Sequence, residues 1–182
     1  RRLIICRHMR NLEQKHLALL EEAERRSTAG TGNMRACFEL LALAGGIDRT
    51  CAMRLAPHRL SEGKFVLLFL LHGQCDGLSP HELAEKAGVT RATITGLLDG
   101  LERDGFIARR FGLEDGRKIA VVLTSRGQEL ARDLFNEHSA WIASLFAGFS
   151  DDDRKTLSGL VQRIWDNLEG ANGPQAAQEA RA

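Results

Sequence analysis

Side chains that donate hydrogen bonds to phosphate groups and to base edges gather in two parts of one stretch, residues 90–126. The first part combines threonine hydroxyls with a guanidinium group, and the second part is rich in arginine. A cluster of such donors predicts contacts with a nucleic-acid backbone and with the edges of its bases. The candidate donors are Thr90, Arg91, Thr93 and Thr95 in the first part, and Arg109, Arg110, Arg117 and Lys118 in the second.

Two short helices are predicted to position the first group of donors. Residues 79–82, Ser-Pro-His-Glu, form a capping box with proline at the first helical position, where its missing N–H costs nothing. Gly88 suits the left-handed backbone that ends this helix. Thr90 is a favourable N-cap for a second helix that runs to about Asp104 and is closed by Gly105. The pattern predicts a helix-turn-helix, and two merely packed helices are the alternative.

The second helix has two chemically different faces. One face is apolar at helical spacing, and we expect it to form the core through Ile94, Leu97, Leu98 and Leu101. The opposite face is small and polar, which lets the helix backbone approach a partner closely. Its residues are Ala92, Gly96, Asp99 and Arg103, with Arg91 and Thr95 beside them.

A β-hairpin is predicted to follow the second helix. Residues 106–111 and 118–123 are rich in β-formers, and Asp115-Gly116 is a strong turn signal. Between Gly105 and Gly127, five cationic side chains minus two acidic ones leave three positive charges, on a chain whose net charge is +1. Such a basic ribbon beside a polar helix is typical of a surface that binds a phosphate backbone. A basic face that contacts only solvent is the alternative.

Residues 34–168 resemble the multiple-antibiotic-resistance regulator (MarR) family. The most specific match is Asp115-Gly116-Arg117, which fits the family's Asp-x-Arg signature, followed by Leu-Thr-x-x-Gly at residues 123–127. The resemblance implies a mainly α fold with a small β-wing, that is, a winged helix-turn-helix plus a helical dimerisation layer. It also implies that Arg117 enters the minor groove, oriented by Asp115, and that the helix beginning near Thr90 reads the major groove. Relatives often carry a polar or basic residue at the position of Gly96, which argues against base readout there.

Apolar periodicity predicts five further helices, at residues 12–26, 34–55, 61–71, 124–145 and 150–168. The third contains seven consecutive apolar residues, which also suit a buried strand, but its capping serine favours a fully buried helix. The predicted organisation is an N-terminal extra helix and linker at 1–33, a helical dimerisation region at 34–60 and 124–169, the winged helix-turn-helix at 61–123, and a disordered tail at 170–182.

Broad apolar stripes on the helices at both ends predict a homodimer. Two-fold symmetry would place two recognition helices about one DNA turn apart, which matches a palindromic site. The alternative is a monomer whose terminal helices fold back over its own core.

Two kinds of switch remain open from the sequence. The resemblance implies a small aromatic or phenolic effector, for which His58, Arg59, His72 and Trp141 offer cationic and aromatic partners. Relatives with reactive cysteines make a thiol switch the alternative, with loop residue Cys75 as its candidate. Cys37 and Cys51 lie on one apolar helix face, where cysteine usually behaves as a small hydrophobe. His72 and Cys75 alone make a weak metal site, so we expect neither a metal nor a cofactor.

The sequence favours a DNA-binding regulator over other classes of protein. It shows neither a phosphate-cradling loop nor a nucleophile with a partner base, so we expect no enzyme. No stretch of about eighteen apolar residues suggests a membrane span, and the expected compartment is the cytoplasm. We expect a repressor that binds a palindromic operator as a homodimer and is released by a small ligand. A redox sensor of the same fold, or a winged-helix protein-interaction module without DNA binding, is the alternative.

Overall fold

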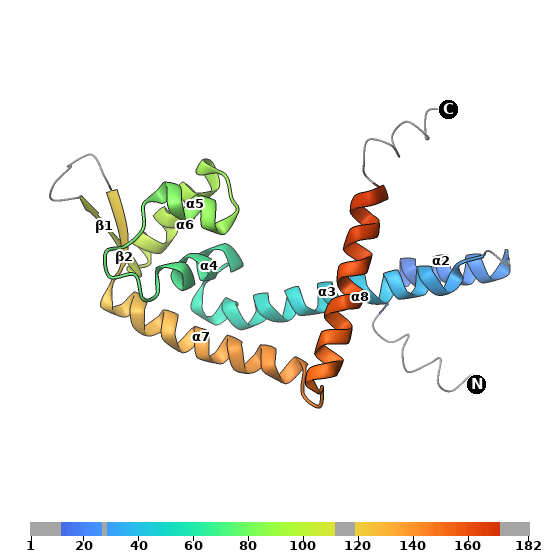
Figure 1. Cartoon of the computed structure of the whole chain (residues 1–182). Coiled ribbons are helices and arrows are strands. Elements are labelled where there is room, and N and C mark those ends of the chain that lie inside the picture. The colour runs from blue at the N-terminus through green and yellow to red at the C-terminus, as the bar shows by residue number, and fades with distance from the viewer. Residues whose placement is uncertain (1–11, 27–28, 112–118, 172–182) are drawn as a thin grey trace. The chain divides into compact units, whose positions relative to one another are not determined.

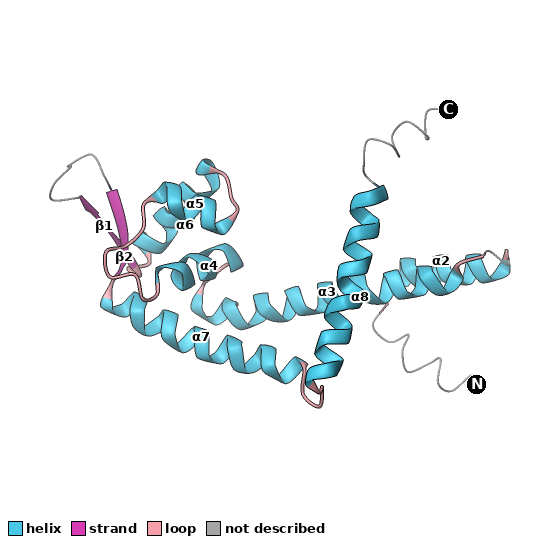
Figure 2. Ribbon diagram, viewed as in Figure 1, coloured by secondary structure: helices cyan, strands magenta, loops and turns pink. Residues whose placement is uncertain are grey.

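The computed structural model describes residues 12–26, 29–111 and 119–171. These residues form helices and a single antiparallel two-stranded hairpin, which confirms the predicted mainly α fold with a small β-wing (Figure 2). None of the helices in the described ranges combines the length and the apolar composition needed to cross a membrane. The elements are α2 (Gln14–Arg25), α3 (Thr31–Leu55), the 3-10 helix η2 (Ala56–His58), α4 (Glu62–Leu71), α5 (Pro80–Ala87), α6 (Arg91–Arg103), β1 (Ile107–Phe111), β2 (Ile119–Leu123), α7 (Ser125–Leu145) and α8 (Asp151–Ala171).

The chain divides into two compact units, residues 1–132 and 133–182, and α7 runs across the boundary. The first unit contains the helix-turn-helix formed by α5 and α6, with α4 and the hairpin beside it (Figure 1). Its centre is a set of fully buried side chains contributed by α4, α5, α6 and β2. The set comprises Leu67, Leu68, Leu71, Leu83, Ile94, Leu98, Leu101 and Val121.

The two caps of the helix-turn-helix are formed as predicted. The Ser79 hydroxyl accepts a hydrogen bond from the Glu82 backbone N–H at 3.2 Å, and the Glu82 carboxylate accepts one from the Ser79 backbone N–H at 2.8 Å. Hydrogen bonds from the Ser79 hydroxyl and N–H hold the pKa of Glu82 below its ordinary value. Gly88 ends α5 with φ of 64°, and Thr90 caps α6 by accepting from the Thr93 N–H. Local sequence signals therefore determine where both helices begin and end.

The hairpin is attached to the core by a third extended segment that the sequence did not indicate. Leu78, just before α5, pairs with Val121 of β2 through two backbone hydrogen bonds of 2.8 and 3.0 Å. Gly77 precedes it with φ of 76°, and a Cβ atom there would overlap the Val121 carbonyl oxygen. Glycine is needed at this position because of both its backbone conformation and the lack of space.

The Leu-Thr-x-x-Gly motif closes the other end of the hairpin. The Thr124 hydroxyl donates to the Gly105 carbonyl at 2.8 Å and accepts from the Gly127 N–H at 3.1 Å. A Cβ atom at Gly127 would overlap the carbonyl oxygen of Phe106. The motif thus joins the end of β2, the start of α7 and the turn after α6.

The expectation that the helix at residues 61–71 is fully buried is wrong in the single chain. The apolar run of α4 forms a helix, but Phe69 is 46% exposed. On α3, which belongs to the predicted dimerisation region, Leu55 is buried, whereas Cys37, Leu41 and Ala44 are exposed. Within the described part of the first unit, α2, η2 and α4 contact this long helix, and the His16 ring of α2 stacks on that of Phe38.

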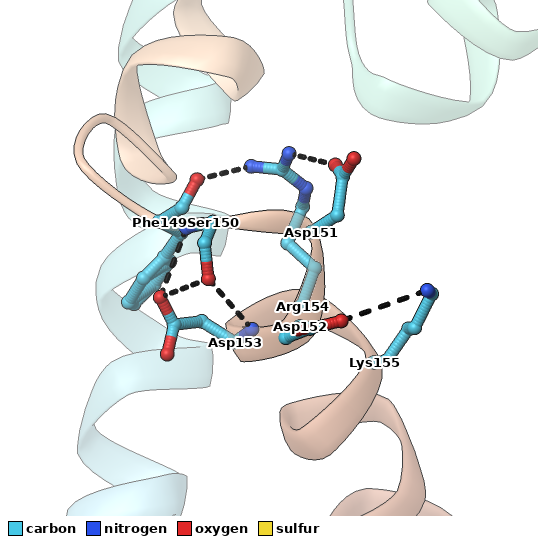
Figure 3. Close-up of polar contacts among 7 residues, drawn as sticks. All are labelled: Phe149, Ser150, Asp151, Asp152, Asp153, Arg154 and Lys155. Carbon is cyan, nitrogen blue, oxygen red and sulfur yellow. Dashed lines mark hydrogen bonds and ion pairs between the residues drawn. The ribbon is translucent and has the colours of Figure 1, made fainter.

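In the second unit, α8 begins at a reciprocal cap (Figure 3). The Asp153 carboxylate accepts from the N–H and hydroxyl of Ser150 at 2.9 and 2.7 Å, and the Ser150 hydroxyl accepts from the Asp153 N–H at 3.1 Å. Arg154 donates to the Phe149 carbonyl at 2.7 Å and also pairs with Asp151. The helix continues through Gly170 and Ala171, which corrects the predicted start of the tail, and residues 172–182 lie outside the described ranges.

The apolar stripe predicted on α8 is present but exposed in the single chain. Each of its members is between 38% and 50% exposed. They are Leu157, Leu160, Val161, Ile164 and Leu168.

Candidate nucleic-acid interface

The outward face of α6 is exposed along its whole length, as the sequence predicts. Its apolar side packs inward through Ile94, Leu98 and Leu101, while residues 91–93, 95, 96 and 99 are open to solvent. A Cβ atom at Gly96 would meet nothing within 4 Å, so the space above this part of the helix is open. A partner can therefore approach the helix backbone closely here.

The threonine hydroxyls of this face are ordered by local hydrogen bonds. The Thr90 hydroxyl accepts from the Thr93 N–H at 3.2 Å and lies 2.9 Å from the Thr93 hydroxyl. The Thr95 hydroxyl donates to the Arg91 carbonyl at 2.9 Å. Because a hydroxyl has one proton and two acceptor lone pairs, Thr95 presents an acceptor outward. It is suited to receive a hydrogen bond from a base amino group.

An open groove of about 830 Å³ joins α6 to its neighbours. It brings Arg91 and Thr95 together with the first turn of α5 and with Ile119, which lies at the loop-side end of the β1–β2 ladder. The exposed residue His81 stands on the α5 side of this groove and was not singled out from the sequence. The sequence places His81 in the capping box, in the first turn of α5. The first helix of a helix-turn-helix usually crosses the DNA backbone, so this position could have been recognised as a candidate DNA contact.

The two adjacent arginines of β1 do not share a surface. The strand register pairs Arg109 with Val121 and Arg110 with Ala120, and successive side chains on a strand point to opposite faces. Arg109 forms ion pairs with Asp99 and Glu102 of α6. Arg110 lines a separate pocket of about 260 Å³. Within the described part of the hairpin, these two arginines therefore do not form one basic surface.

Arg126, a third of the five cationic residues counted in the hairpin region, contacts the protein itself. The Arg126 guanidinium lies over the ring of Phe106, 4.8 Å from its centroid, and donates to the Asp104 carbonyl at 3.3 Å. A cation at this place stabilises the carboxyl-terminal end of α6. The remaining predicted wing residues, Asp115, Arg117 and Lys118, lie outside the described residues.

The four residues predicted to hold a ligand are not brought together within one unit. His58 and Arg59 precede α4 and His72 follows it, and a ten-residue helix separates its ends by about 15 Å. Arg59 is exposed and near enough to Asp104 to help lower the pKa of that carboxyl, after the hydrogen bond from Lys64. Trp141 belongs to the second unit, where it is buried with its ring 5.0 Å from that of His138. A ligand site at these residues stays a prediction.

The described cysteines differ in their surroundings. Burial, together with the nearby carboxylates of Glu62 and Asp48, raises the pKa of the Cys51 thiol, which disfavours the reactive thiolate. Cys75 is exposed and lines the same small pocket as Arg110. Within the described residues, no group of three or more His, Cys, Asp or Glu side chains is placed to hold a metal ion.

Comparison with known proteins agrees with this geometry. A family model described as MarR family matches residues 60–119. The HTH-type transcriptional repressor YetL of Bacillus subtilis is 37% identical over 162 residues, covering 84% of this chain and 97% of YetL. The Homoprotocatechuate degradative operon repressor of Escherichia coli is 28% identical, covering 59% of this chain and 72% of that protein.

A solved structure shows the same fold. Streptococcus pneumoniae FabT, in its complex with DNA, matches with a TM-score of 0.64 at 20% identity, over 76% of this chain and 98% of FabT. The resemblance to the MarR family is thus confirmed by the family model, by a 37% identical relative that covers 84% of the chain and by the fold. The chain belongs to the MarR family and is a winged-helix, DNA-binding transcriptional regulator.

Proposed function

We propose that the protein is a repressor that binds a palindromic operator as a homodimer and releases it when a small aromatic or phenolic ligand binds. In this proposal α6 enters the major groove and the hairpin reaches the neighbouring minor groove. The observation that carries it is the exposed face of α6, which presents Arg91, Thr95 and the open position at Gly96 to solvent. The repressor name of the 37% identical relative supports the sign of regulation.

We assign different tasks to the polar residues of α6. Arg91 is suited to a phosphate or a base edge because its side chain is exposed beside the groove. Thr95 offers an acceptor for base readout. Thr90 and Thr93 are engaged with each other at the helix start, so they present ordered hydroxyls to the backbone of the DNA.

The wing supplies the second set of proposed contacts. By family resemblance, Arg117 enters the minor groove with Asp115 beside it, and Arg110 and Lys118 approach phosphates. Replacement of Arg117 by alanine should weaken operator binding without unfolding the protein, as shown by an unchanged circular dichroism melt. Unchanged affinity in that variant would remove the wing tip from the mechanism.

Exposed apolar faces support the homodimer. On α3, Leu40, Leu41 and Leu43 are 41–61% exposed, and the α8 stripe is exposed to a similar degree. Surfaces of this kind mark protein contacts, and a second copy would bury them by two-fold symmetry. Light scattering during size-exclusion chromatography should give twice the chain mass at micromolar concentration. Ile164→Asp should shift the protein toward the monomer; a wild-type monomer would overturn this part of the proposal.

The effector class is supported by a relative. The Escherichia coli protein is named for a homoprotocatechuate degradative operon, and homoprotocatechuate is a phenolic acid. In a titration of the DNA complex, homoprotocatechuate or benzoate should displace the protein, whereas acetate at equal concentration should not. If no aromatic acid acts, treatment with peroxide, repeated with Cys75→Ser, tests the thiol switch instead, because Cys75 is exposed.

The experiment that tests the whole proposal is selection of duplexes from a random library by the purified protein. The predicted result is an enriched inverted repeat whose half-sites lie about ten base pairs apart. A library that stays random after several rounds would favour the protein-interaction module, because such a module has no preferred DNA sequence.

A further inference from the structure

Arg109 lies between the hairpin and α6 and contacts both. It is a β1 residue, yet its Nη2 atom is 2.6 Å from Asp99 Oδ1 and its Nη1 atom is 3.0 Å from Glu102 Oε2. The two acids are three residues apart and therefore lie on the same face of α6. The contact joins the wing to the outward face of the helix that is proposed to read DNA.

This geometry makes use of the shape of the guanidinium group. Two different nitrogen atoms reach two different carboxylates, which a single lysine ammonium group cannot do in the same fixed orientation. The Arg109 side chain is 30% exposed, and those of Asp99 and Glu102 are 56% and 39% exposed. The cluster is thus a partly exposed bridge at the edge of the proposed DNA surface.

The charge of the cluster argues against a phosphate contact by Arg109. One guanidinium and two carboxylates sum to one negative charge at neutral pH. A phosphate would be repelled by the pair of acids, and Arg109 could bind it only by giving up a carboxylate. Arg110 has no such constraint from α6, because it lies on the other face of the hairpin.

We propose that Arg109 is a positioning residue for DNA recognition. It holds the middle of the hairpin ladder against α6, and it offsets Asp99 and Glu102, which would otherwise repel the DNA backbone. The inference rests on the proposed function, because it takes α6 and the hairpin to engage DNA together. From the sequence, Arg109 is expected to contact DNA directly. In this proposal it instead fixes the orientation of the hairpin relative to α6, and those two elements contact the DNA.

The bridging role is tested first without DNA, by hydrogen exchange of the hairpin amides. Arg109→Gln and Asp99→Asn should speed exchange in residues 107–111 and 119–123. Arg35→Gln is the matched control, because the Arg35–Glu24 pair has side-chain exposures of 30% and 57% but joins α3 to α2. It should leave hairpin exchange unchanged. Unchanged exchange in Arg109→Gln and Asp99→Asn would overturn the bridge.

The role in recognition is tested with a duplex selected by the wild-type protein and a scrambled duplex of the same composition. Asp99→Asn removes a negative charge, so charge alone predicts tighter binding to both. The positioning role predicts about tenfold weaker binding to the selected duplex and no loss on the scrambled one. The double variant Asp99→Asn/Arg109→Gln should bind about as weakly as either single variant, because both break the same bridge. Arg109→Lys should not restore affinity.

A phosphate contact would give the opposite results. Asp99→Asn would then bind the selected duplex more tightly, and Arg109→Gln would lower the slope of log affinity against log salt by about 0.9. Either result overturns the positioning role. If the wild-type protein selects no duplex at all, the proposed function fails, and the hydrogen-exchange measurement still decides whether Arg109 holds the hairpin.

Discussion

Lys64 of α4 lies directly across Gly100 of α6, so that a Cβ atom at Gly100 would be 2.8 Å from Lys64 Cε. The lysine continues to Asp104, whose Oδ2 atom is 2.7 Å from Nζ. Gly63 makes the reciprocal approach, because a Cβ atom there would be 3.1 Å from Leu97 Cδ1. The first turn of α4 therefore sets the position of the second half of α6.

Two glycines of the same helix are predicted to respond differently to alanine. Gly96→Ala should raise the free energy of unfolding by about 0.5–1 kcal/mol, because alanine favours helix and nothing lies within 4 Å of the new methyl group. Gly100→Ala should gain less, because the Lys64 side chain must move away from its ion pair. Urea denaturation measures both changes.

The control for this comparison is the Lys64→Ala background. Without the lysine side chain, Gly100→Ala should regain most of the benefit seen at position 96. Equal gains at the two glycines in the wild-type background would show that the close contact between α4 and α6 has no energetic consequence.

Acid should weaken the α4–α6 contact. A hydrogen bond from Lys64, together with its charge, holds the pKa of Asp104 below its ordinary value. Such a carboxyl stabilises the folded protein fully above its unfolded pKa of about 3.9, and the contribution is lost as pH falls through the lower folded pKa. Asp104→Asn should therefore have a lower free energy of unfolding than the wild type at pH 7. Between pH 7 and pH 2.5 its free energy of unfolding should fall by less than that of the wild type, because the variant has no carboxyl to protonate at this position. Parallel stability curves over pH 2.5–7 would contradict this.

Two glycines with positive φ provide a second matched pair. Gly73 and Gly77 have φ of 82° and 76°, but a Cβ atom at Gly73 meets nothing within 4 Å, whereas at Gly77 it overlaps the Val121 carbonyl. Gly73→Ala should cost about 1–2 kcal/mol from backbone strain alone. Gly77→Ala should cost about 3 kcal/mol or more, because the Leu78–Val121 pairing must also shift. If thermal or urea unfolding shows that the two variants lose similar amounts of stability, the overlap with the Val121 carbonyl has no energetic cost.

Local sequence signals were sufficient to predict the helix-turn-helix formed by α5 and α6. Each helix boundary is determined by residues at that boundary, namely the caps at Ser79 and Thr90 and the stop at Gly88. The buried face of α6 is determined by the spacing of Ile94, Leu98 and Leu101. The wing motif identified the family because its residues are adjacent in the chain. The inward and outward faces of α6 followed directly from the helical period.

Contacts between distant residues were not predictable in the same way. The Leu78–Val121 pairing and the Lys64–Asp104 ion pair join residues about forty positions apart, and no local pattern marks them. Strand alternation alone would have predicted that Arg109 and Arg110 lie on opposite faces of the hairpin. It could not have predicted the ion pairs of Arg109, because its acidic partners belong to α6. The apolar stripes of α3 and α8 were found by periodicity, yet periodicity cannot distinguish a core within one chain from a face for a second copy.

The central claim is that the exposed face of α6 binds DNA, and a salt titration with a selected duplex tests it most directly. For the wild-type protein, log affinity should fall linearly with log salt, with a slope of about 0.9 for each phosphate neutralised. Arg91→Ala should bind more weakly at every salt concentration and, if Arg91 contacts a phosphate, with a slope smaller by about 0.9. An affinity that is independent of salt and unchanged in Arg91→Ala would contradict the account.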